Sequence, residues 1–433
     1  MADDFRRYFL LFRYSSHTEL ILKCLQMQLG VICSVGIWTL SEVKLQAAQT
    51  HQTWKSPPEL TEQITKLNPE SPLMPLPSGF WQTPILIAAP ENFNPDLRLP
   101  PALPKPPQNS NPDPTSTEAP QNSNPATTST ESGKPDAVLE SINTDYRYDT
   151  DNFGQTTVFF EPTAQFRLSN GNKIFFKTGF NFFEQRSVES IINFPLQIGW
   201  QGKIGDVTVQ TAAGVDVFNR LPTAINLNAK LEVPISPPQV SSSGKLRSLA
   251  VLSGNLEQGP YKANARTLEN QITALRFGPD LYWQINRNTS FFSSLRLGNY
   301  NDGNFEVQSL SRLERKFGQF SLAANLFSSS FARNLERTSG YFSPSDFLVY
   351  NAEVAWEGDI ANFLRCRLAA NLGQQRLQGK FDNANTYQTR CTVKVSPDIE
   401  ADIGYSFSNV RNQETGGSTY SGNSLTGQLR VKF

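Results

Sequence analysis

The sequence predicts an all-β protein, a transmembrane up-and-down antiparallel β-barrel of about 16 strands that follows a disordered proline-rich segment. Apolar and polar residues alternate strictly after residue 137, which gives each strand one face for lipid and one for water. The alternating segments span about ten residues or more, whereas an average soluble strand has about five or six. A soluble β-sandwich also alternates, so strand length and the pattern of turns decide between the two folds.

Residues 1–48 are interpreted as a secretory signal peptide. The segment from Gln28 to Leu40 has an apolar core of about 12 residues, which is too short to cross a bilayer but suits a signal peptide. The small residues Ala47 and Ala48 offer a cleavage site. The alternative is a short buried helix of a cytosolic protein, which is disfavoured because the proline-rich sequence that follows offers nothing to bury it against.

Residues 49–136 are rich in Pro, Ser, Thr and Asn, and they contain the near-repeats PQNSNPDPTSTE from Pro107 and PQNSNPATTSTE from Pro120. This composition cannot bury enough apolar surface to offset the entropy of the chain. We therefore predict a disordered spacer in the periplasm. The functional alternative is an anchor to peptidoglycan or a docking site for a periplasmic partner, which the apolar residues Phe80 and Trp81 keep open.

Composition excludes several classes of protein. Lys+Arg and Asp+Glu both number 39, so no overall field recruits nucleic acid. No run of about 18 apolar residues follows residue 40, which excludes a helical membrane protein. The two histidines, His17 and His51, precede the predicted barrel, which therefore lacks the general base that barrel hydrolases need. Cys24 and Cys33 lie in the predicted signal peptide, and the two remaining cysteines cannot form a zinc site. We expect no enzyme, no cofactor and no metal.

Residues 137–433 are assigned to the barrel. The clearest strand is the last, where Leu425, Gly427, Leu429 and Val431 alternate with polar residues up to Phe433. This ending resembles the signal by which the assembly machinery recognises bacterial outer-membrane barrels. Strand centres are placed near residues 144, 162, 178, 194, 212, 229, 251, 274, 294, 310, 325, 351, 368, 391, 403 and 428. A count of about 14 or 18 would also be even, as single-chain bacterial barrels require.

Turns and aromatic residues orient the predicted barrel. Short turns recur at 169–172, 202–206, 286–289, 316–319 and 396–399, all on one side if the strands run up and down. Both ends of the barrel then face the periplasm. Trp200, Trp283 and Trp356 lie beside these turns, where an aromatic girdle is expected. Three prolines fall inside assigned strands and must occupy irregular positions: Pro162, Pro195 and Pro234.

The inward faces of the last strands bring charges together near the periplasmic end. They come from Glu353, Glu357, Arg365, Arg367, Arg390, Lys394, Asp398, Glu400, Asp402, Arg430 and Lys432. A charge inside a barrel must be hydrated or paired. A salt-bridge network that braces the wall is one interpretation, and a selectivity ring or a track for a polar polymer is the other. The carboxylates of Glu400 and Asp402 also suit a glycosidase, but alternating acids on an inward face need no catalytic role.

Cys366 and Cys391 share the lipid-facing phase of adjacent strands, and a hairpin near Gly379 would place them nearly opposite each other. The periplasm is oxidising, so they could form a disulfide. The alternative is two small apolar residues of the wall.

The segment Gly340-Tyr-Phe-Ser-Pro344, followed by FLVYNAEVAWE, resembles the G-Y-F-S-P signature of the cellulose-exporting outer-membrane porins. Sixteen strands agree with that family and its poly-N-acetylglucosamine-exporting relatives. The family has helical tetratricopeptide repeats before its barrel, where this chain has proline-rich sequence. The resemblance implies a conduit without catalytic residues.

The sequence thus predicts a passive conduit in the outer membrane of a Gram-negative-type bacterium, with an exopolysaccharide as its cargo. A general diffusion porin for small polar solutes is the rival, and a barrel that anchors the envelope through its spacer is the alternative of another class. The expected partners are outer-membrane lipid, the barrel assembly machinery, a polysaccharide, and a periplasmic protein or peptidoglycan.

Overall fold

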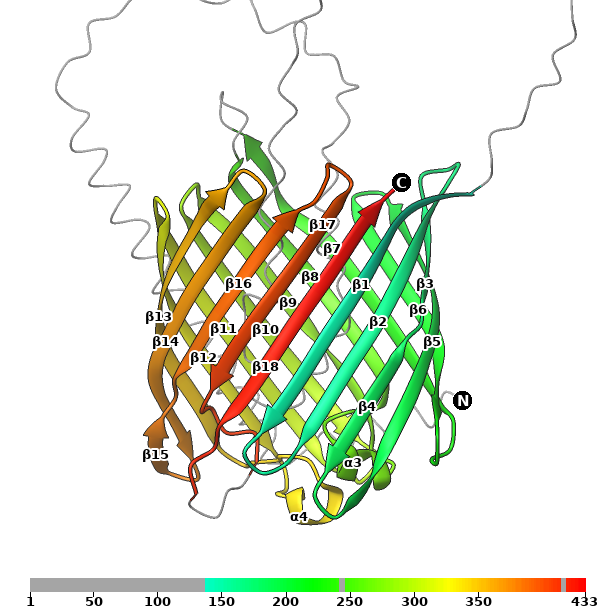
Figure 1. The fold of residues 1–433 in the computed structure, drawn as a ribbon, viewed down its shortest axis with the longest axis vertical. Coiled ribbons are helices and arrows are strands. Elements are labelled where there is room, and N and C mark those ends of the chain that lie inside the picture. Colours follow the sequence, from blue (N-terminus) through cyan, green and yellow to red (C-terminus); the bar gives the residue numbers. More distant parts are fainter. Residues whose placement is uncertain (1–136, 241–245, 414–417) are drawn as a thin grey trace, which may run out of the picture. The chain divides into compact units, whose positions relative to one another are not determined.

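The structure, a computed structural model, describes residues 137–240, 246–413 and 418–433. The predicted signal peptide and proline-rich spacer lie outside these residues. Eighteen strand segments form one antiparallel sheet, and β1 pairs with β18, which closes the sheet into a barrel (Figure 1).

The eighteen segments make up sixteen strands in the described part of the chain. Strands β3 and β4 both lie between β2 and β5, and β15 and β16 both pair with β14, so each couple is one interrupted strand (18 − 2 = 16). The segments are β1 (Ala137–Asp151), β2 (Thr156–Leu168), β3 (Lys173–Lys177), β4 (Phe180–Gln185), β5 (Val188–Ile204), β6 (Val207–Phe218), β7 (Ala224–Val240), β8 (Leu246–Pro260), β9 (Thr273–Asn286), β10 (Thr289–Tyr300), β11 (Phe305–Phe317), β12 (Phe320–Phe331), β13 (Phe347–Ala361), β14 (Leu364–Leu377), β15 (Lys380–Asn383), β16 (Thr386–Lys394), β17 (Ile399–Ser408) and β18 (Gly422–Lys432).

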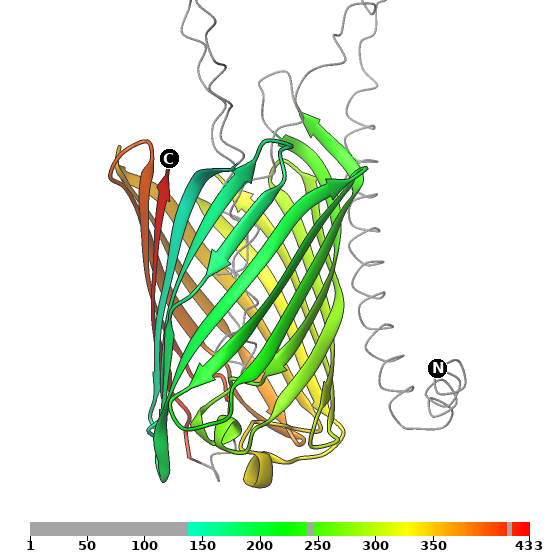
Figure 2. The ribbon, with the colours of Figure 1, turned by 90° about the vertical axis from the view of Figure 1, so that its right-hand side faces the viewer.

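The two ends of the barrel differ. Ala137 and Phe433 lie at the same end, together with the five predicted short turns, and we call this the turn end (Figure 1). The opposite, loop end has the longer connections, which include α3 (Ala265–Glu269) and α4 (Glu336–Ser339) (Figure 2). The predicted strand count and the common side of the turns are confirmed. Each predicted centre lies in a strand, apart from residue 178, which lies in the gap between β3 and β4.

The prolines explain one of the strand interruptions. Pro162 and Pro195 lie on the strands that flank Thr178 and Gly179, the two residues between β3 and β4. Proline has no amide hydrogen to donate to a neighbouring strand, so regular pairing stops at this point. Gly179 has a φ of 148°, and a Cβ there would meet the Phe160 carbonyl oxygen. Pro234 lies at a register shift between β7 and β8, so all three prolines occupy irregular positions.

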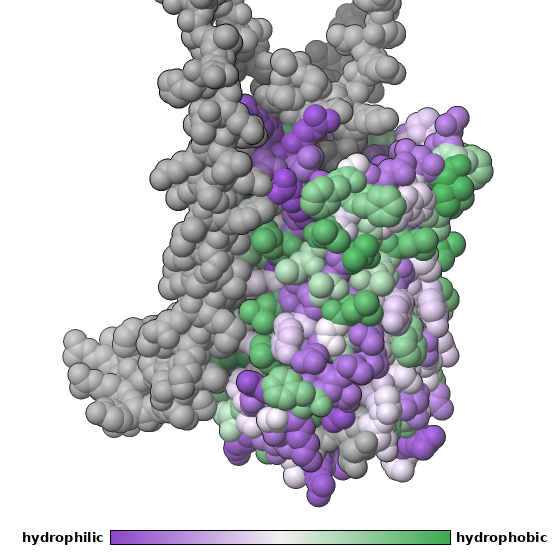
Figure 3. Space-filling model, turned by 90° about the vertical axis from the view of Figure 1, so that its left-hand side faces the viewer, coloured by the Kyte–Doolittle hydropathy of each residue, from purple (hydrophilic) through white to green (hydrophobic). Residues whose placement is uncertain are grey.

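The outward face is apolar. Alternate residues on β5, β7, β13 and β14 expose large side chains such as Ile198, Leu231, Val354 and Leu372. Figure 3 shows hydrophobic side chains across the middle and upper part of one side and hydrophilic ones near the loop end. Trp200, Trp283 and Trp356 share the outward phase near the turn end, and the indole of Trp356 donates to the Gln319 side chain at 3.2 Å. No helix in the described ranges is long and apolar enough to cross a membrane.

Cys366 and Cys391 are directly opposite each other on β14 and β16, in the outward phase, and they form a disulfide. The predicted register of these strands is therefore confirmed. Non-reducing mass spectrometry should find the two cysteine peptides linked. Replacing both cysteines by serine should lower the free energy of unfolding by about 2 to 3 kcal/mol, because the unfolded chain loses a cross-link over a separation of 25 residues. Rapid labelling of both thiols in the untreated protein would contradict this assignment.

The C-terminal residue allows assembly to be tested separately from stability. The Phe433 side chain is 69% exposed, and its backbone amide donates to the Glu140 carbonyl at 3.1 Å. Deleting Phe433 should therefore leave the folded barrel nearly as stable, yet reduce the amount of membrane-inserted protein if this residue is the assembly signal. The measurement is the heat-modifiable fraction in outer-membrane preparations, with Phe433→Trp as the control that keeps an aromatic end. Equal insertion of the deletion variant would remove this role.

Candidate functional site

The lumen of the barrel is the candidate site, and the predicted charges of the last strands face it. Glu353 and Glu357 on β13 lie in the inward phase, where Glu353 is directly opposite Asn371 and Glu357 opposite Arg367 of β14. The ion pairs are Arg367–Glu353 at 2.6 Å, Arg365–Glu357 at 2.9 Å, Arg390–Asp402 at 3.0 Å and Arg430–Glu400 at 2.8 Å. The acids that suited a glycosidase, Glu400 and Asp402, are thus each bound to an arginine.

Three of the predicted residues belong to the rim rather than to this network. Lys394 and Lys432 are the last residues of β16 and β18, and both are exposed. Asp398 was expected on the inward face of a strand, but it lies exposed in the turn before β17. Its backbone carbonyl, which accepts from the Lys432 amide at 2.9 Å, ties the turn to β18. The strand prediction was therefore one residue too long at this point.

The most buried charge network extends beyond the predicted set. Arg312 of β11 is 2% exposed and donates to both oxygens of Glu353 and to Glu314. Asn325 accepts from Arg312 and donates to Asn351 and Asn371 on the next two strands. The network thus connects the inward faces of β11, β12, β13 and β14. The sequence does contain a signal for Arg312, because it shares one phase of β11 with Leu310 and Glu314.

Three further networks line the wall on other strands. Arg276 of β9 is 2% exposed and bonds to Glu306 at 3.2 Å and Glu257 at 3.1 Å. Tyr300 donates to Glu306 at 2.8 Å. The other networks are Glu161 with Lys177 and Asn181, and Asp216 with Asn193, Asn226 and Lys262. The charged groups of these networks are therefore paired, as a low-dielectric wall requires.

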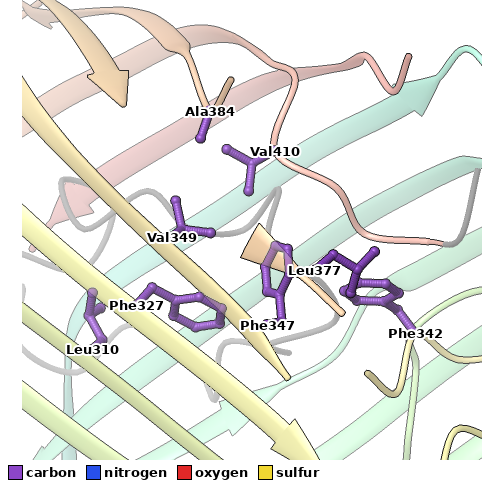
Figure 4. Close-up of a cluster of buried hydrophobic side chains, with 8 residues drawn as sticks. All are labelled: Leu310, Phe327, Phe342, Phe347, Val349, Leu377, Ala384 and Val410. Carbon is purple, nitrogen blue, oxygen red and sulfur yellow. The ribbon is translucent and has the colours of Figure 1, made fainter. Parts of the chain in front are cut away.

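Apolar side chains fill part of the lumen near the loop end. Phe347 and Val349 of β13, with Phe327 of β12, point inward and pack against residues that come from loops (Figure 4). The loop residues are Phe342, from the G-Y-F-S-P segment, and Val410, which follows β17. The loops therefore fold into the mouth of the barrel and pack against its inner wall.

The G-Y-F-S-P segment is fixed by hydrogen bonds as well as by packing. The Tyr341 side chain is fully buried among Tyr261, Tyr300 and Phe331. Its hydroxyl donates to Asp302 at 2.9 Å and accepts from Asn304 at 3.0 Å. Burial, helped by the negative charge of Asp302, raises the pKa of Tyr341 well above its ordinary value, so this phenol stays protonated and remains a donor.

The loop with α3 closes another part of the same mouth. Ala265 and Leu268 of α3 pack against the inward residues Phe183 and Ile191. Lys262, just before the helix, forms a 2.5 Å ion pair with Asp216 of β6. The side chain of Arg266 donates to the Arg337 carbonyl at 2.8 Å, which joins the α3 and α4 loops. The loop end is thus filled from several directions, while the described connections at the turn end are short hairpins.

Comparisons with known proteins agree on the fold. No family model matches the sequence, and no curated protein matches it. A solved structure described as a bacterial polysaccharide outer membrane secretin matches with a TM-score of 0.56 at 11% identity, over 68% of this chain and 98% of that one. This chain has the fold of an outer-membrane β-barrel. CdiB from Acinetobacter baumannii matches with a TM-score of 0.43 at 10% identity (67% and 60% of the two chains). OccAB3 from Acinetobacter baumannii matches with a TM-score of 0.37 at 10% identity (69% and 99%).

The described residues contain no group of three or more His, Cys, Asp or Glu side chains that could hold a metal ion. The arrangement that the structure offers is a polar, charge-paired passage with a loop-filled end. Such a passage can bind and release polar solutes without changing them chemically.

Proposed function

We propose that the protein is a passive outer-membrane conduit and that its cargo is an exopolysaccharide on its way out of the cell. The observation that supports this most is the inward face, where carboxylates, guanidinium groups and amides follow one another along the strands. A polymer with many hydroxyl groups can exchange hydrogen bonds with such groups step by step. Weak, repeated contacts of this kind allow entry as well as release.

Blocking of ionic current by oligosaccharides tests this cargo. In a polymer conduit, oligosaccharides should interrupt the current with dwell times that rise with chain length, whereas single sugars should have little effect. The measurement is single-channel recording of the purified chain over a series of oligosaccharides. Block that depends on solute size alone would instead support the porin described below.

Arg365 and Arg367 provide a residue-level version of this experiment. Both point into the lumen, and Arg365 is 47% exposed, so its guanidinium is available to a passing solute. Substituting both by alanine should shorten oligosaccharide dwell times in a polymer conduit. In a diffusion porin it should mainly shift the preference between anions and cations. That shift should fade with salt, since charges are screened over about 10 Å at 0.1 M ionic strength.

A general diffusion porin for small polar solutes is the second candidate, favoured by the paired charges, which need no polymer to explain them. The third candidate, a barrel that anchors the envelope through its proline-rich segment, is favoured by the filled loop end. A chain that inserts normally but passes no current in any variant would support the anchor. On each of the three proposals the barrel has no enzymatic role.

A further inference from the structure

Basic residues form a rim at the turn end of the lumen, and their number exceeds that of the acids beside them. Lys203 on β5, Arg247 on β8, Lys394 on β16 and Lys432 on β18 all lie within two residues of a strand end. Each is exposed, and Lys203, Lys394 and Lys432 share the phase of inward neighbours, such as Gln201 for Lys203, whereas Arg247 lies at a register shift between β7 and β8. We call these four residues the rim cations. In the strand order around the barrel they form two pairs, on β5 and β8 and on β16 and β18, which β1 to β4 separate on one side and β9 to β14 on the other.

The rim cations differ from the charges deeper in the lumen because none of them has an ion pair within the described ranges. Deeper arginines, such as Arg430 and Arg390, are each held by a carboxylate. Other positive groups near the rim outnumber their partners as well. Arg167 and Lys173 share one acid, Glu140.

The acids at this level do not cancel the excess. The exposed acids are Asp206 and Asp398 in the turns and Asp359, which lies 4.0 Å from Arg365. The exposed Arg287, in the turn after β9, adds a further positive charge, so the rim cations and Arg287 still outnumber these three acids. An excess of one sign at a low-dielectric opening focuses the field and raises the local concentration of the opposite ion. Charge pairs deeper in the lumen contribute much less to this field because their charges largely cancel.

We infer that the turn end of the lumen is a binding site for an anionic polysaccharide, whose carboxylates are held in succession by the rim cations. This inference rests on the proposed function and narrows its cargo to a polymer that carries negative charge. The inward phase of Lys203, Lys394 and Lys432 favours a ligand in the lumen over lipid headgroups outside the barrel. Lysine and arginine suit carboxylates through charge-assisted hydrogen bonds that water keeps weak and reversible.

Calorimetric titration of the purified full-length chain with a short galacturonic-acid oligosaccharide tests the inference without any need for current. The oligosaccharide should bind, and a glucose oligosaccharide of the same length should bind much more weakly. Raising the ionic strength from 0.1 M to 1 M should abolish the difference, because the screening length falls from about 10 Å to about 3 Å. Equal binding of the two oligosaccharides would overturn the inference.

The variants locate the site. Lys203→Gln with Arg247→Gln, and separately Lys394→Gln with Lys432→Gln, should each weaken binding, and the fourfold variant should weaken it by about tenfold or more. The matched control is Arg337→Gln with Lys380→Gln, which removes one arginine and one lysine at the loop end and should leave binding unchanged. Loss of binding in this control, or retention in the fourfold variant, would overturn the inference. Equal inhibition of oligosaccharide binding by anionic lipid vesicles would also overturn the inference, because it would place the anion site outside the lumen. If the charged oligosaccharide binds as expected but no current flows, the inference stands and the proposed conduit function is wrong.

Discussion

Replacing Glu353 by alanine is expected to lower the free energy of unfolding by about 3 to 5 kcal/mol, the range for removing one partner of a buried ion pair. The Glu353 side chain is fully buried and accepts from Arg312 at 2.7 Å and Arg367 at 2.6 Å. Without Glu353, the Arg312 guanidinium, which is 2% exposed, keeps its ion pair with Glu314 but loses both bonds to the Glu353 carboxylate. Urea unfolding of the barrel in lipid vesicles measures the change in the free energy of unfolding, with loss of heat modifiability as the signal for unfolding.

Glu357→Ala is the matched control, since it makes the same chemical change four residues away on the same face. Its partner Arg365 is half exposed, so we expect a loss of at most about 1 kcal/mol. Equal losses in the two variants would mean that the Arg312 network is hydrated rather than buried. Glu353→Gln, which keeps the size and an acceptor oxygen, should fall between the two.

Opening the loop end is the second large effect that we expect. Tyr341→Ala removes the ring that packs against Tyr261, Tyr300 and Phe331 and the hydrogen bond to Asp302. Removing a buried aromatic side chain lowers the stability of the packed state by about 3 to 5 kcal/mol. This loss destabilises the packed position of the loop, so the loop can leave the mouth. The swelling rate of vesicles in a small sugar should therefore rise strongly. Lys262→Ala frees the α3 loop from Asp216 and should act in the same direction.

Tyr350→Ala provides the control for this opening. Tyr350 lies in the outward phase of β13 and is 40% exposed, so the same substitution there leaves the mouth intact. Its swelling rate should match that of the unmodified chain. A rise in Tyr350→Ala, or no rise in either loop variant, would show that the loops do not limit passage.

The fold could be predicted from the sequence because a barrel strand has a local signature. The period of two is visible in the last strands above all, and turn residues such as Gly171 and Gly318, with positive φ, mark the hairpins. The register of β14 and β16 was also accessible, since the hairpin at Gly379 fixes which residues face each other.

The filled mouth could not be predicted in this way. Phe342 and Val410 lie in loops without periodicity, and only the tertiary structure brings them against Phe347. The deepest ion pairs were missed for a similar reason, because Arg312 and Glu353 are 41 residues apart and on strands that are not direct neighbours. The strand predicted to include Asp398 was one residue too long because the alternation of apolar and polar residues continues into the turn.

Single-channel recording of the purified full-length chain in planar bilayers shows whether the polar lumen is a path across the membrane. We expect small or infrequent current steps for the unmodified chain and larger, more frequent steps for Tyr341→Ala. Absence of current in both proteins, each shown to be inserted and heat-modifiable, would contradict this expectation.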